Sequence, residues 1–111
     1  MTQVYAFTVH VTGTPGSIMP PELGGAYVRC YATGPDHEVA GRRIVAKLRA
    51  DGLNVEEVRQ QMLQFDASQW ALHVKDNWPE YAADLASQAE FDEAMAEGRV
   101  VYGPFGGYNP Q

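Results

Sequence analysis

The chain has 111 residues, of which 45% are hydrophobic and 20% charged, and its formal net charge is −6. This length suits a single domain over residues 1–111, and the acid excess argues against nucleic acid as a partner. One cysteine, Cys30, cannot form an internal disulfide, and no apolar run approaches the roughly 20 residues of a membrane-spanning helix. We therefore expect no membrane partner.

The N-terminal residues predict a strand in a cytoplasmic protein. MTQVYAFTVHV lacks the basic region and the small-residue cleavage site of a secretory signal, which favours a cytoplasmic location. Apolar side chains alternate along residues 4–11, with the period of a half-buried strand. Thr8 and His10 share one face of this strand.

Residues 13–25, GTPGSIMPPELGG, are predicted to form a long loop because four glycines and three prolines exclude regular structure. The loop carries apolar side chains at Ile18, Met19 and Leu23. Long loops of this kind often contact another chain, so Ile18 and Met19 are candidate binding residues. The alternative is that they close the edge of the core.

A second strand is predicted at residues 26–33, again from alternation. Tyr27, Arg29 and Tyr31 share one face, and Cys30 lies on the other. We expect Cys30 to be buried against helices, with a normal or raised pKa, and to have a structural role.

Gly34 and Pro35 end this strand, Asp36 caps a helix that runs to about Ala50, and Gly52 stops it. Gly41 lies inside this helix, either because a strand approaches closely there or because glycine is merely tolerated. A third strand is predicted at residues 53–65, where the apolar side chains change parity as a bulge would require.

Three helix-start signatures follow, at Asp66, Asn77 and Ser87, and predict three short helical segments. A last strand is predicted at residues 99–103, and residues 104–111 read as a turn-rich tail anchored on the body. The order favours an α+β two-layer sandwich: a four-stranded antiparallel or mixed sheet with helices on one face. It is loosely ferredoxin-like, although a loop rather than a helix separates the first two strands.

Charge is distributed unevenly along the chain. Eight carboxylates and one lysine lie between Asp66 and Glu97, whereas residues 1–65 hold six acidic and six basic residues. Separation of this kind favours a basic or a self-complementary partner.

The sheet face opposite the helices is the predicted contact surface. It should present His10, Tyr27, Arg29 and Tyr31, joined by Tyr102 from the last strand. Tyrosines beside an arginine combine apolar area, hydrogen bonds and cation stacking. Three interpretations remain open: ordinary cross-strand pairs or cover by the loop and tail, a self-association surface, or a surface for a ligand or another partner. Single-stranded RNA is disfavoured because Arg29 is the only basic residue expected there.

The sequence contains no recognisable catalytic constellation, and we predict no catalytic residue, metal or cofactor. The three histidines lack metal-ligand spacing, and His73 with Asp76 is interpreted as a surface helix contact. The leading hypothesis is a small cytoplasmic protein-interaction module without enzymatic activity, acting as a homo-oligomer or bound to another protein. The alternative is a small-molecule-binding protein or cofactor-independent enzyme in which His10, Arg29 and Tyr31 meet the substrate.

Overall fold

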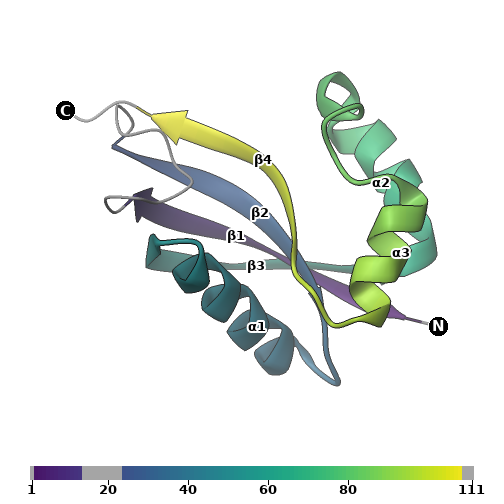
Figure 1. Cartoon of the computed structure of the whole chain (residues 1–111), viewed down its shortest axis with the longest axis horizontal. Coiled ribbons are helices and arrows are strands. Elements are labelled where there is room, and N and C mark those ends of the chain that lie inside the picture. Colours follow the sequence, from purple (N-terminus) through teal and green to yellow (C-terminus); the bar gives the residue numbers. More distant parts are fainter. Residues whose placement is uncertain (1, 14–23, 109–111) are drawn as a thin grey trace.

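The computed structural model describes residues 2–13 and 24–108 (Figure 1). Ile18 and Met19, predicted as binding residues, lie outside the described residues. Within these ranges no helix is both long and apolar enough to cross a membrane. The elements in chain order are β1 (Gln3–Gly13), β2 (Gly25–Thr33), α1 (His37–Ala50), β3 (Leu53–Asp66), η1 (Ala67–Gln69), α2 (Trp70–Asn77), η2 (Pro79–Tyr81), α3 (Gln88–Ala96) and β4 (Val101–Tyr108).

In the described part of the chain, four strands form one antiparallel sheet in the order β3-β1-β2-β4. β1 and β2 pair without interruption from Val4–Thr33 to Val11–Ala26. The pairing of β1 with β3 shifts register twice, because β3 uses more residues than β1 over the same length. The predicted irregularity in the third strand is therefore confirmed.

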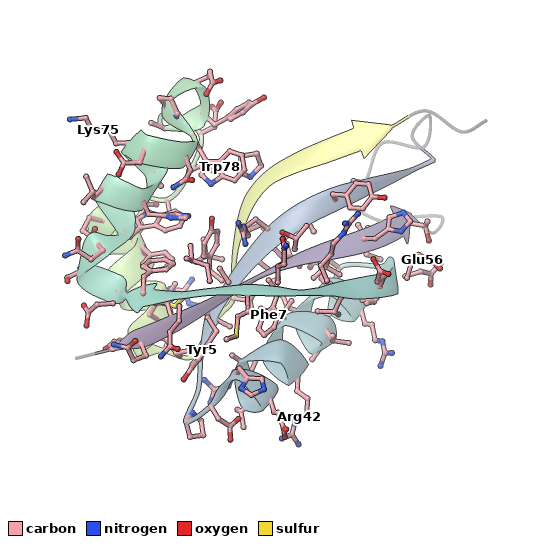
Figure 2. All side chains as sticks on the ribbon, turned by 180° about the vertical axis from the view of Figure 1, so that it is seen from behind. Tyr5, Phe7, Arg42, Glu56, Lys75 and Trp78 are labelled. Carbon is pink, nitrogen blue, oxygen red and sulfur yellow. The ribbon has the colours of Figure 1, made fainter. Side chains whose placement is uncertain are left out.

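Two apolar cores lie on opposite faces of this sheet. On the first face α1 covers the strands through Ala40, Ile44 and Leu48, and Tyr5 and Phe7 of β1 point toward it (Figure 2). The second core packs η1, α2 and α3 against one end of the other face. It comprises Val4, Ala6, Tyr31, Ala67, Trp70, Val74, Phe91, Ala94 and Met95.

The predicted gathering of all helices on one face is therefore wrong. Figure 1 shows α1 and the α2–α3 pair on opposite sides of the sheet. Val4 and Ala6 make the start of β1 apolar on its second face too, and a strand buried on both faces needs cover on both. The two-layer sandwich and the ferredoxin-like arrangement are not confirmed.

Three of the four residues predicted to cap the start of a helix do so. Side chains of Asp36, Asp66 and Ser87 accept hydrogen bonds from backbone amides, and Ser87 forms a reciprocal capping box with Glu90. The start predicted at Asn77 yields only the short turn η2, capped by Trp78 without a side-chain hydrogen bond.

β4 extends further than predicted. It pairs with β2 from Tyr31–Val101 to Gly25–Tyr108, so the expected tail continues the strand as far as Tyr108. Between the pairs Val28–Phe105 and Cys30–Tyr102, β4 holds one extra residue. This bulge places Tyr102 opposite Cys30, on the face that α1 covers.

Candidate functional site

The α2–α3 pair covers one end of the second sheet face, and no other helix within residues 2–13 and 24–108 covers the remainder (Figure 1). The remainder contains a shallow depression of about 470 Å³, formed by β1, β2 and β3. We call this depression the cradle. Its lining residues are Thr8, Tyr27, Arg29, Arg59, Gln61, Met62 and Leu63.

Tyr27 is the aromatic centre of the cradle. Its ring stacks on His10, with centroids 4.8 Å apart and planes inclined by 19°. The Arg59 guanidinium carbon lies 5.0 Å from the centroid of the same ring, which is cation–π geometry. The contacts with His10 and Arg59 hold the amphipathic ring of Tyr27 at the surface, where the residue stays 38% exposed.

Arg29 and Arg59 make the cradle positively charged. Arg29 is partly exposed, and its charge opposes the rise that burial causes in the pKa of Tyr31 and adds to the fall that burial causes in the pKa of His73, so it lies near His73 of α2 as well. β4 pairs Gly106 with Tyr27 and therefore brings no side chain over that position. Among the described side chains, β4 therefore adds none to the cradle beside Tyr27.

Tyr31 does not belong to the open surface, contrary to prediction. It does lie on the predicted face, but Trp70 packs edge-on against its ring at 4.9 Å and the side chain is fully buried. Its hydroxyl oxygen is 2.7 Å from His73 Nε2 and accepts a 3.3 Å hydrogen bond from Trp78 Nε1. Burial raises the pKa of Tyr31, and the Trp78 hydrogen bond opposes this.

His73, interpreted from the sequence as a surface helix contact with Asp76, is half-buried and joins α2 to the sheet. Asn77 Nδ2 donates to the His73 carbonyl at 2.9 Å and also faces Nδ1 at 3.3 Å. The Tyr31 hydroxyl and His73 Nε2 share one hydrogen bond, whose donor is set by the imidazole tautomer. Burial lowers the pKa of His73, helped by Arg29 and opposed by Asp76. Its burial could have been predicted from its spacing: His73 lies three residues after Trp70, which places it beside the apolar stripe of α2.

Tyr102 is also displaced from the predicted surface. Because of the β4 bulge, it packs on the α1 side and donates a 2.7 Å hydrogen bond to Asp51 Oδ2. This bond is the main cause that lowers the pKa of Asp51, whereas burial and Asp51 raise that of Tyr102. Tyr102 therefore ties β4 to the end of α1. Cys30 is buried as predicted, and burial raises the pKa of its thiol to about 12.

The predicted trio of His10, Arg29 and Tyr31 is not brought together as a catalytic site. His10 pairs with Tyr27, which is four residues from Tyr31 along β2, about 13 Å in a strand. Across residues 2–13 and 24–108 no cluster of three or more His, Cys, Asp or Glu side chains could hold a metal ion. The arrangement offers an aromatic, basic and apolar contact surface.

Comparisons of the chain with family models, with curated proteins and with solved structures give no match. We therefore infer function from the cradle and its surroundings.

Proposed function

We propose that this protein is a self-associating interaction module whose contact surface is the cradle. Tyr27 and Leu63 are each 38% exposed, next to Arg29 and Arg59. Tyrosine and arginine are enriched at protein interfaces and supply many of the residues that dominate binding energy. This grouping of exposed apolar side chains with two arginines is the observation that supports the proposal.

Charge favours a second copy as the partner. The cradle is basic, whereas Asp66 to Glu97 carries eight carboxylates and one lysine. Two copies can therefore present opposite charges to each other, which speeds encounter and fixes orientation. As expected from the sequence, we also propose a cytoplasmic location and no enzymatic activity.

Replacing Tyr27 and Leu63 together by Ser tests the proposal. Sedimentation velocity should show an oligomer for the unmodified chain and a monomer for the double variant, because the substitution removes apolar area from the contact. The matched control is Val58→Ser. Val58 is 37% exposed but lies beside α1, on the opposite side of the sheet. The control should remain oligomeric.

Two results would overturn self-association through the cradle: an unmodified chain that is monomeric, or a double variant that stays fully oligomeric. If the oligomer survives while a co-purifying small anion is lost, the cradle is instead a ligand site. Its volume of about 470 Å³ lies in the range of small-molecule sites, and its two arginines would select an anion.

A further inference from the structure

The segment from α2 through η2 to Asp84, residues 70–84, projects from the sheet as an arm (Figure 1). Trp78 points from the arm back toward the sheet (Figure 2). The far end presents Tyr81, which is 46% exposed, between exposed Glu80 and Asp84. We call these three residues the arm tip.

The two carboxylates of the arm tip are available to an external cation. Within the part of the chain that the structure describes, neither Glu80 nor Asp84 forms a side-chain hydrogen bond or ion pair. Of the other six carboxylates of the acidic region, four have a hydrogen-bond or ion-pair partner: Asp66 with Ser68, Glu90 with Ser87, Asp92 with Gln88 and Glu97 with Arg99.

The arm tip is held in a defined shape. Backbone amides of Asp84 and Leu85 donate to the Tyr81 carbonyl at 2.8 and 3.2 Å. At its base, Trp70 donates to the Ala86 carbonyl at 2.7 Å and stacks on Phe91, with centroids 4.1 Å apart. The arm is therefore pre-organised, which reduces the entropy lost when it binds.

The cradle offers the complementary chemistry. Arg29 and Arg59 supply positive charge, and Tyr27 and Leu63 supply apolar surface. Arg59 also lies 3.7 Å from Glu57, but an exposed pair of this kind is worth at most about 1 kcal/mol, so another carboxylate can compete for it. No arm residue lines the cradle of the same chain.

We propose that the arm tip of one copy docks in the cradle of a second copy, and the reverse, so that the contact is made twice. In this arrangement Glu80 and Asp84 meet Arg29 and Arg59, and the Tyr81 ring lies on Tyr27 and Leu63. A two-fold dimer requires such a self-complementary pair of surfaces. This inference rests on the proposed self-association and names the segment that fills the cradle.

Charge reversal provides the test. One variant carries Arg29→Glu with Arg59→Glu in the cradle, and the other carries Glu80→Arg with Asp84→Arg in the arm tip. Each should dimerise at least about tenfold more weakly than the unmodified chain, since like charges then face each other twice. Arg29 is partly exposed and the other three positions are exposed, so folding should persist, and a circular-dichroism melt of each variant checks this.

Mixing the two variants in equal amounts should restore dimerisation. In the mixed dimer, the reversed cradle meets the reversed arm, and the unmodified arm meets the unmodified cradle. Glu93→Arg is the matched control, because it reverses an exposed carboxylate of α3 outside the arm tip and should leave dimerisation unchanged.

Sedimentation equilibrium distinguishes the possible failures. If the unmodified chain is monomeric, both proposals fall. The chain could dimerise through Tyr27 and Leu63 while the charge-reversed variants dimerise as well as the unmodified chain. In that case self-association stands, but the arm tip does not fill the cradle. Variants that stay monomeric when mixed also overturn the arm-to-cradle pairing.

Discussion

At the scale of single residues, the Tyr31 hydroxyl connects the sheet to α2 through His73 and Trp78. Tyr31→Phe removes this partner from two side chains that are partly withdrawn from water. We expect the free energy of unfolding to fall by about 1–2 kcal/mol, because an unsatisfied polar group keeps its desolvation cost. Urea denaturation followed by circular dichroism measures the change.

Tyr5→Phe is the matched control for this experiment. Tyr5 is largely buried on the other face, and among the described residues its hydroxyl forms no hydrogen bond. We expect a change within about 0.5 kcal/mol for this control. Equal losses in the two variants would show that the Tyr31 network does not stabilise the fold.

The lowered pKa of His73 predicts a pH-dependent stability. As pH falls below 6.5, the ordinary value, the unfolded chain binds a proton at His73 that the folded chain does not. Protonation therefore stabilises the unfolded state, and the free energy of unfolding falls until pH reaches the lower folded pKa. Asp51, Asp66 and Glu90 have a carboxyl pKa lowered from ordinary values of 3.8, 3.8 and 4.5, so they titrate well below the ordinary value of His73.

His73→Gln isolates this effect. Unfolding free energies measured at about pH 7.5 and about pH 5.5 should differ less for the variant than for the unmodified chain, because the variant lacks the linked proton. His10 and His37 are present in both chains, so their contributions cancel. An equal pH dependence in the two chains would contradict the assignment to His73.

At the scale of elements, the contact between α1 and the sheet leaves room at Gly41. A Cβ built there would lie 3.9 Å from the Phe7 ring, an ordinary van der Waals distance. Glycine is therefore tolerated at this position rather than required, which was one of the two sequence interpretations. We expect Gly41→Ala to raise the free energy of unfolding by about 0.5–1 kcal/mol.

Gly34→Ala should have the opposite effect. A Cβ at Gly34 would lie 3.1 Å from Ala40 N and 3.2 Å from both Asp36 O and Val39 Cβ, so backbone atoms would have to move. Thermal unfolding of both variants measures the contrast. A lower melting temperature for Gly41→Ala than for the unmodified chain would refute the packing described for α1.

The sequence predicted elements well where the periodicity was uninterrupted. β1 and β2 pair in perfect alternation, so parity correctly predicted the exposed Tyr27 and the buried Cys30. Alternation predicts which face of the sheet a side chain lies on, but it does not predict whether a helix covers that side chain. Burial of Tyr31 depends on where Trp70 docks, which is a long-range contact that no local pattern encodes.

Bulges account for the remaining misassignments at the candidate site. The register shifts of β3 concealed Arg59, whose place over Tyr27 follows from the extra residues between Val58 and Met62. One extra residue in β4 moved Tyr102 to the α1 face. A single inserted residue reverses the face of those beyond it, so predictions based on alternation fail there.

At the scale of the whole molecule, the separation of a basic cradle from an acidic arm predicts salt-sensitive association. Raising the ionic strength from about 0.05 M to about 0.5 M shortens the screening length from roughly 14 Å to roughly 4 Å. We expect the dimer dissociation constant, measured by sedimentation equilibrium, to rise. A constant that stays unchanged or falls would indicate an apolar contact in which Arg29 and Arg59 play no part.

Native mass spectrometry of the gently purified, unmodified protein tests most directly whether the cradle joins copies of this chain. We predict a dimer of two chains with no retained small molecule, which the Tyr27→Ser, Leu63→Ser variant converts to a monomer. An unmodified chain found only as a monomer, either bare or holding a small anion, would contradict self-association through the cradle.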